Sequence, residues 1–180
     1  MQLKDSRTGY GPISIANHWV IAILIIAMIA LGLYLEDMPR SPEKRFLVGL
    51  HQSFGILALV LGLFRVQWRL RSGMPDQAAP LPRWQEVASI WTHRLLLLFV
   101  IAMPISGYLW EAGEGHAPSF FGLFSLPALP KTPWVENIGH LVHGLGSKIL
   151  ILLILVHVAA ALKHHLFDKD ATLRRMLRPV

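Results

Sequence analysis

Four apolar stretches, each long enough to cross a bilayer as a helix, constrain this chain more than any other feature. The first extends from Thr8 to Leu35 without a charged residue, which exceeds the roughly 20 apolar residues that a membrane-spanning helix needs. We expect helices at about residues 13–35, 46–70, 87–110 and 139–165. The sequence therefore predicts an all-α membrane protein, in which residues 1–180 form a single four-transmembrane-helix bundle.

The composition excludes several other classes of protein. Hydrophobic residues make up 53% of the chain and charged residues 16%, whereas soluble domains carry about 25% charged residues. The absence of cysteine excludes disulfides, thiolate metal sites and covalent C-x-x-C-H haem attachment. We interpret the net charge of +6 as lysine and arginine gathered on one membrane face. Membrane lipid is therefore an expected partner and nucleic acid is not.

The distribution of lysine and arginine predicts the orientation of the bundle. Positively charged residues are retained on the cytoplasmic side of a membrane. If the chain crosses four times, twelve of its seventeen lysines and arginines fall at the two termini, in the second loop and at the adjoining span ends. Both termini are therefore expected to be cytoplasmic, and the first and third loops to face outward. The third loop contains four prolines and cannot form one long helix; they are Pro118, Pro127, Pro130 and Pro133.

Four histidines lie inside the apolar stretches, where ionisable side chains are rare and usually functional. They are His18, His51, His143 and His157. His18 and His157 fall near the cytoplasmic side of their helices, whereas His51 and His143 fall near the outer side. The sequence therefore predicts two pairs at two depths of the bundle.

The spacing of the last two histidines places both pairs against one helix. Fourteen residues separate His143 from His157, so they project within about 40° of each other and lie roughly 21 Å apart along the helix axis. His140 is an alternative to His143, but its spacing leaves it about 100° from His157. We therefore expect His143 to pair with His51, and His140 to contact a haem propionate, water or a loop.

Each pair of imidazoles suits haem iron better than zinc. Zinc takes about four protein ligands, and neither depth offers an obvious third and fourth. Haem iron needs two axial ligands, because the porphyrin supplies four nitrogens. With both axial positions filled by protein, outer-sphere electron transfer is favoured over oxygen binding. The four histidines therefore predict two bis-histidine haems spanning most of the bilayer.

Two further residues repeat the spacing of the expected ligands. Arg65 follows His51 by fourteen residues, which places it at the depth of the inner haem, where it can bind a propionate or anchor the helix at the membrane surface. His164 follows His157 by seven residues, about 20° from the same face, and can handle protons for a quinone or lie in the interface. His93 can face a haem edge.

The chain resembles the bacterial cytochrome b561 family, which is related to the cytochrome b subunits of nickel–iron hydrogenases. The resemblance covers nearly the whole chain and is most specific in the tail. It rests on Ile15-Ala-Asn-His18-Trp19, Leu50-His51-Gln-Ser-Phe-Gly55-Ile, Arg65 with Trp68-Arg69, Pro104-Ile-Ser-Gly107-Tyr, His143 with His157, and the segment from Ala161 to Met176 that contains His164-His165 and Asp168-Lys-Asp170.

The resemblance implies two non-covalent haem b groups, one held by His18 and His157 and the other by His51 and His143. It also implies an oxidoreductase in the bacterial inner membrane that exchanges electrons with the quinone pool, and one branch of the family oxidises superoxide with ubiquinone as acceptor. The outer-side electron donor is not identified by the residues, and the outer loops are nearly balanced in charge. The haem anchor of a larger dehydrogenase or hydrogenase, and a metal-ion transporter, are the alternatives.

Overall fold

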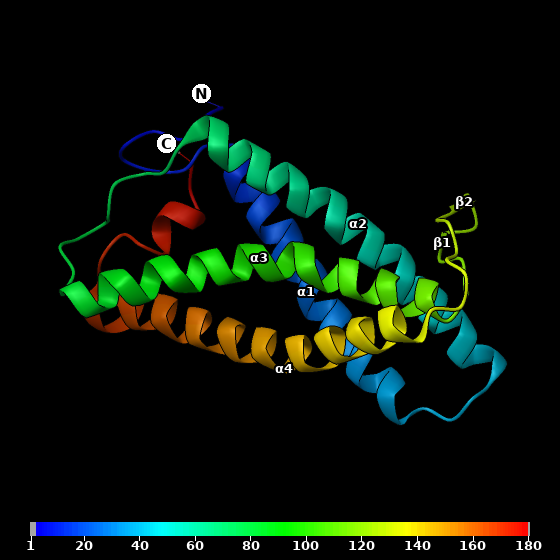
Figure 1. Ribbon diagram of the computed structural model, residues 1–180. Helices are drawn as coiled ribbons and strands as arrows, with labels where there is room; N and C mark the ends of the chain where they lie inside the picture. Colours follow the sequence, from blue (N-terminus) through cyan, green and yellow to red (C-terminus); the bar gives the residue numbers. More distant parts are fainter. Residues whose placement is uncertain (1–2, 180) are drawn as a thin grey trace.

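The computed structural model describes residues 3–179, in which four long helices dominate (Figure 1). The helices are α1 (Pro12–Asp37), α2 (Pro42–Ser72), α3 (Arg83–Gly113) and α4 (Pro133–Lys163). All four are long and apolar enough to cross a membrane. The prediction of a mainly helical protein with four helices that can span a membrane is therefore confirmed.

Three helices begin several residues earlier than the apolar stretches predict. Pro42 and Pro133 lie in the first turns of α2 and α4, where the missing N–H of proline costs no hydrogen bond. The Ser41 hydroxyl caps α2 by accepting a hydrogen bond from the N–H of Lys44 at 3.0 Å. Hydropathy marks where a chain enters the apolar layer, whereas caps and prolines mark where a helix starts, so the two boundaries differ.

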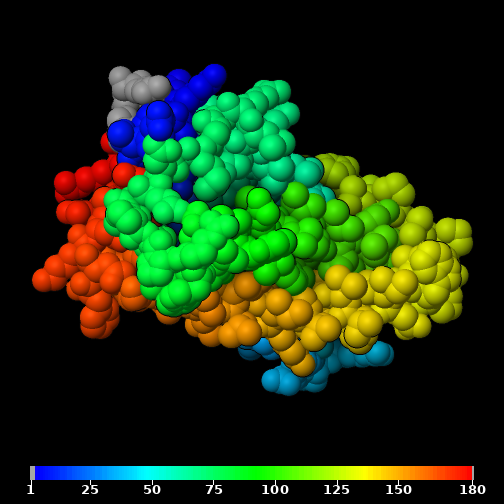
Figure 2. Space-filling model, turned by 60° about the vertical axis from the view of Figure 1, so that its left-hand side comes forward, coloured from blue at the N-terminus to red at the C-terminus, as the bar shows by residue number. Residues whose placement is uncertain are grey.

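The helices pack unevenly around a small core. α3 lies along α4 for most of its length (Figures 1 and 2), α1 packs on α2, and α2 packs on α3. Within residues 3–179, α1 and α2 approach the backbone of α4 at few points. Only 11–22% of each apolar stretch is buried within the protein, as expected when lipid covers the rest. The buried core consists of Ile21, Ile25, Ala58, Val100, Met103 and Leu150.

One end of the bundle carries a short antiparallel hairpin, and we name it the hairpin end. β1 (Ser119–Phe120) pairs with β2 (Phe124–Ser125). The buried hydroxyl of Ser53 on α2 ties the hairpin down, because it donates to the Ser119 carbonyl at 3.0 Å and accepts from the Phe121 N–H at 2.9 Å. The loop between α1 and α2 lies at this same end (Figure 1).

The opposite end holds both termini, and we name it the terminal end (Figure 1). Here α4 continues into a π-helical turn, η1 (His164–Asp168), and a short 3₁₀ helix, η2 (Arg174–Met176). The Trp19 indole donates to the Met176 carbonyl at 2.7 Å, and Arg175 donates to the Asp76 carbonyl at 2.8 Å. The tail is therefore tied to α1 and to the linker between α2 and α3.

Candidate functional site

The pair nearer the terminal end joins α1 to α4. The ring centroids of His18 and His157 lie 6.2 Å apart, with 60° between the ring planes. Both residues are half-buried. We name these two residues the terminal-end pair. The structure thus brings together the two histidines that their depth in the sequence predicts to meet.

The second pair lies toward the hairpin end and joins α2 to the same helix α4. The ring centroids of His51 and His143 are also 6.2 Å apart, with 71° between the ring planes. We name these residues the hairpin-end pair. α4 therefore contributes one imidazole to each pair.

The ring separation tests which metal group fits between the imidazoles. A metal–imidazole bond is about 2.0 Å long and the ring centre lies roughly 1.2 Å behind the nitrogen, so ligands on opposite sides of a metal have centroids about 6.4 Å apart, and tetrahedral ligands about 5.2 Å. The observed 6.2 Å in both pairs matches ligands on opposite sides. Haem iron with two axial imidazoles has that arrangement, so both pairs fit haem.

The space between α1 and α4 is apolar. A groove of about 150 Å³ lies between the two helices. The residues that line it are Ile26, Ile29, Ile151, Ile154 and Leu155. Apolar ligand sites in proteins are lined mainly by side chains of this kind.

Two glycines allow the hairpin-end imidazoles to lie against neighbouring helices. A Cβ atom on Gly107 would lie 3.2 Å from the His143 Cε1 atom, and one on Gly32 would lie 3.4 Å from the His51 Cε1 atom. The sequence analysis identified neither glycine by this role, because the contact joins helices that are distant along the chain. Gly107 does lie in the Pro104-Ile-Ser-Gly107 motif, which is the signal that could have pointed to it.

Three of the four imidazoles differ in what surrounds their Nδ1 atoms. His143 Nδ1 lies 3.1 Å from both the Met103 carbonyl oxygen and the Ser106 hydroxyl. Among the described residues, the buried His51 Nδ1 has no hydrogen-bond partner. His18 Nδ1 lies 3.3 Å from a guanidinium nitrogen of Arg65.

Arg65 lies beside the terminal-end pair, at the depth that its spacing from His51 predicts. Besides its contact with His18, its guanidinium donates to the Asn17 side-chain oxygen at 3.3 Å. No carboxylate within residues 3–179 forms an ion pair with Arg65. The structure therefore places an arginine without an acidic partner beside one of the two pairs.

His164 lies in the π-helical turn that continues α4. Its Nδ1 contacts carboxylate oxygens of Asp170 at 2.8 Å and Asp168 at 3.0 Å, and the Lys163 ammonium contacts Asp168 at 2.6 Å. Partial burial acts to raise the pKa of Asp170, but hydrogen bonds from Thr172 and His164 outweigh it and hold that pKa below its usual value. The sequence analysis did not identify the two carboxylates as partners of His164.

Three further histidines lie in the spans and loops beside the two pairs. His93 on α3 lies with its ring centroid 5.2 Å from that of His157, and its Nδ1 is 2.7 Å from the Ser89 carbonyl. His140 packs against Trp110 at 4.5 Å between ring centroids, and the same Trp110 ring lies 6.3 Å from the His143 ring. His116 in the third loop lies 3.4 Å from Glu111. Depth in the span was the only sequence signal for His93.

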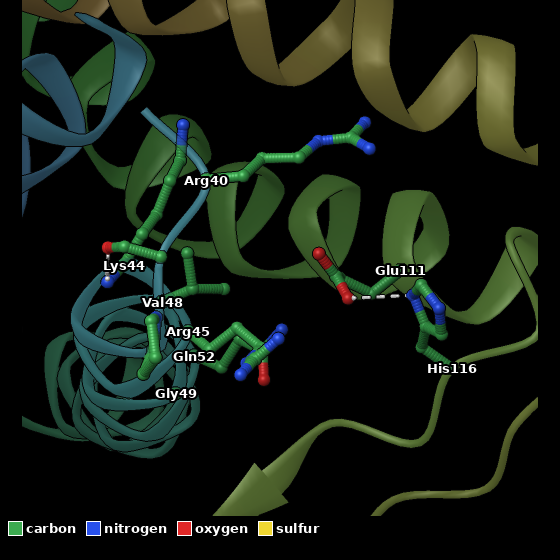
Figure 3. A pocket seen from close by; sticks show the side chains of 10 residues that line it. Arg40, Lys44, Arg45, Val48, Gly49, Gln52, Glu111 and His116 are labelled. Atoms are coloured by element: carbon green, nitrogen blue, oxygen red, sulfur yellow. Dashed lines mark hydrogen bonds and ion pairs between the residues drawn. The ribbon is translucent and has the colours of Figure 1, made fainter. Parts of the chain in front are cut away.

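A cleft of about 540 Å³ opens at the hairpin end, between the start of α2 and the end of α3 (Figure 3). Three cationic side chains from the first loop and the first turn of α2 line one side: Arg40, Lys44 and Arg45. Glu111 and His116 form an ion pair on the other side (Figure 3). The loops taken as a whole are nearly balanced in charge, so their composition did not reveal that three cations and one carboxylate, Glu111, line this cleft.

Comparisons with known proteins agree with this geometry. Residues 9–179 match the family model described as prokaryotic cytochrome b561. The chain is 35% identical to "Cytochrome b561 homolog 2" of Escherichia coli (strain K12), over 98% of this chain and 95% of the relative. It is 30% identical to "Cytochrome b562" of Cereibacter sphaeroides (95% and 96%) and 30% identical to "Probable superoxide oxidase CybB" of Yersinia pestis (93% and 95%).

The family match covers almost the whole chain, including every histidine of both pairs. The relatives are matched over nearly their full lengths, so the likeness is not limited to one apolar segment. The chain therefore belongs to the prokaryotic cytochrome b561 family of membrane proteins that bind haem b and transfer electrons.

Proposed function

We propose that this protein carries electrons across the bacterial inner membrane through two haem b groups, from a donor on the outer side to a membrane quinone. The observation that carries the proposal is the pair of 6.2 Å ring separations at two levels of one bundle. In this proposal the terminal-end pair, His18 and His157, holds one haem and the hairpin-end pair, His51 and His143, holds the other.

The proposed orientation has the terminal end in the cytoplasm. The positive-inside rule supports it, because the termini, the second loop and the adjoining span ends contain most of the lysines and arginines. Both termini lie at one end of the bundle (Figure 1), as an even number of crossings requires. The terminal-end pair is then the inner one, and the hairpin-end pair is the outer one.

The haem iron, when bound, supplies one-electron transfer, and the protein determines how each haem is held. His18 with His157, and His51 with His143, would hold the two irons, and an iron held by two histidines would offer no position for a substrate. Arg65 is proposed to bind a haem propionate, because it lies beside His18 and has no carboxylate partner among the described residues. The side chains that line the groove between α1 and α4 are apolar.

The proposed electron acceptor is ubiquinone, reduced near the terminal end. A quinone takes up protons together with electrons, so its site needs a group that exchanges protons with the cytoplasm. His164 is proposed for this role, because it lies in the π-helical turn that follows α4 and its Nδ1 contacts the carboxylates of Asp168 and Asp170. A carboxylate that contacts one imidazole nitrogen orients the ring.

The proposed electron donor is superoxide, which reaches the protein from the outer side. The hairpin-end cleft supports an anionic donor, because Arg40, Lys44 and Arg45 outnumber its one lining carboxylate, Glu111 (Figure 3). An excess of one sign of charge in a cleft raises the rate at which oppositely charged substrates arrive. The name of the Yersinia pestis relative, a probable superoxide oxidase, agrees with this choice of donor.

Anaerobic reduction of the purified protein tests the proposed function. Superoxide, supplied as a stable salt in aprotic solvent, is expected to produce the bands of reduced haem b, and a soluble ubiquinone is expected to reoxidise them. Dithionite gives the total reducible haem as the reference. A protein that shows no haem b bands with dithionite would contradict the electron-transfer proposal, whereas bands with dithionite but not with superoxide would contradict only the donor.

A further inference from the structure

A short segment of α3, from Met103 to Gly107, lies against the imidazole of His143. The Met103 carbonyl oxygen is 3.1 Å from His143 Nδ1. The Ser106 hydroxyl is also 3.1 Å from that nitrogen, and it donates to the same carbonyl at 2.8 Å. Both Met103 and Ser106 are buried, so lipid and water do not compete for these bonds. His143 thus has two oxygen atoms at one of its ring nitrogens.

The close approach of the ring depends on the absence of a side chain at Gly107. A Cβ atom there would lie 3.2 Å from His143 Cε1 and 3.3 Å from Nδ1. Such contacts are tighter than ordinary carbon packing at about 3.5–4.0 Å, so an alanine would push the ring away from the α3 backbone. A displacement of a few tenths of an ångström would lengthen the bond to the Met103 carbonyl.

The partners of His143 Nδ1 determine which nitrogen carries the proton. A backbone carbonyl can only accept a hydrogen bond, so Nδ1 must be the protonated nitrogen when it contacts Met103. The other nitrogen, Nε2, is then unprotonated and free to bind a metal. α3 therefore prepares His143 as a ligand through Nε2.

The Nδ1 atoms of His18 and His51 lack such a partner. Among the described residues, His51 Nδ1 is buried without one. His18 Nδ1 lies 3.3 Å from the Arg65 guanidinium; because arginine offers only donors, an Nδ1–H of His18, as required when Nε2 binds a metal, finds no acceptor there. The environment is therefore electron-donating at the hairpin-end pair, through the carbonyl, and cationic at the terminal-end pair, through Arg65.

We propose that the Met103 carbonyl, with Ser106 and Gly107, is the positioning element for His143, and that it makes the hairpin-end haem lower in midpoint potential than the terminal-end haem. The inference rests on the proposed function, because it requires a haem at each level. It goes further in assigning an order of potentials and a set of positioning residues to one of the two sites.

Which haem has the lower midpoint potential follows from the charge on the iron that each environment stabilises. Donation of Nδ1–H to a carbonyl raises the basicity of the ligating nitrogen, which stabilises the oxidised iron and lowers the midpoint potential. A nearby cation such as Arg65 destabilises the more positive, oxidised iron and raises the potential. Electrons therefore move downhill from the hairpin end to the terminal end.

Redox titration of the purified protein in its two-haem form tests the proposal. His143→Ala and His157→Ala variants first identify which spectral component belongs to which level. In the native protein we expect the hairpin-end component to be reduced at the lower potential. In Gly107→Ala we expect its midpoint to shift upward, with the terminal-end component unchanged. Ser106→Ala removes one of the two oxygen atoms near Nδ1 and should shift the same component upward by less.

Gly144→Ala is the matched control, because it adds the same methyl group next to His143 but meets no other atom within 4 Å. It should leave both midpoints unchanged. If Gly107→Ala loses the hairpin-end haem altogether, the potential is read from Ser106→Ala. A lower potential at the terminal-end haem, or unshifted hairpin-end components in both variants, would overturn the inference. A native protein without haem would instead contradict the proposed function.

Discussion

The terminal-end and hairpin-end pairs have the same ring separation but different surroundings. At the terminal end, His18 lies next to the Arg65 guanidinium, and the His93 ring contacts His157. At the hairpin end, His143 is held by a backbone carbonyl and a serine. Equal separations indicate that both pairs suit the same group, whereas unequal surroundings allow the two groups to differ in potential. The residues proposed to bind the haems therefore differ from the residues that would set their midpoint potentials.

The largest expected effect comes from removing one ligand at a time. We expect His157→Ala to lose the terminal-end haem and His143→Ala to lose the hairpin-end haem, because the two pairs share a helix but no ligand. Each variant should retain about half of the native haem per chain, by alkaline pyridine extraction and absorbance. Loss of both haems in either variant, with the protein still folded by circular dichroism, would contradict the separation into two levels.

Reversing charge in the hairpin-end cleft should slow an anionic donor strongly. With Arg40→Glu and Arg45→Glu combined, we expect the association rate of superoxide to fall by about tenfold or more at low salt. Rapid-mixing absorbance of the haem bands measures that rate. Lys169→Glu combined with Arg178→Glu makes an equal change of net charge at the terminal end and should leave the rate nearly unchanged. Equal slowing by both changes would show that net charge, and not the cleft, attracts the donor.

A third prediction concerns the packing of α3 on α4 near the hairpin-end pair. A Cβ atom on Gly139 would overlap the backbone of Trp110. We expect Gly139→Ala to lower the free energy of unfolding by about 1–3 kcal/mol, the usual cost of overpacking a tight contact. Thermal unfolding in detergent, followed by circular dichroism, measures it. Gly144→Ala should have little effect, and equal destabilisation by the two variants would contradict the assigned contact.

The smallest expected effect is a pH dependence of the tail. The lowered pKa of Asp170 means that its carboxylate stabilises the tail at neutral pH and loses this effect as the pH falls through that lowered pKa, below the usual range of an aspartic acid. Fluorescence of the native protein should then report release of Trp19, whose indole binds the Met176 carbonyl. Asp170→Asn should remove the acid transition, and an unaltered transition in this variant would assign it to another carboxylate.

The sequence predicted the helices and the pairing of histidines because both depend on simple periodicity. Apolar length identified the four spans, and a separation of fourteen residues placed His143 and His157 on one face of α4. Arg65 was located by the same spacing. These features need only the geometry of a single helix and the thickness of a bilayer.

The surroundings of the pairs could not be predicted from the sequence, because they depend on contacts between helices. Gly107 approaches His143 from α3, and Gly32 approaches His51 from α1, which requires the rotation of each helix to be known. Other glycines of the bundle, such as Gly62, Gly139 and Gly146, contact α3 in ordinary helix packing, and composition alone does not separate the two kinds. The cationic cleft was hidden for the same reason, since overall loop charge does not show which residues gather.

The most direct test of the account is the number and spin state of the haems in the oxidised native protein. Haem and protein are quantified in the same sample, and electron paramagnetic resonance at low temperature reports the spin state of the iron. The account predicts two haem b groups per chain, both low-spin, as two axial imidazoles on each iron require. A single haem per chain, or a large high-spin signal from iron with an open axial position, would contradict it.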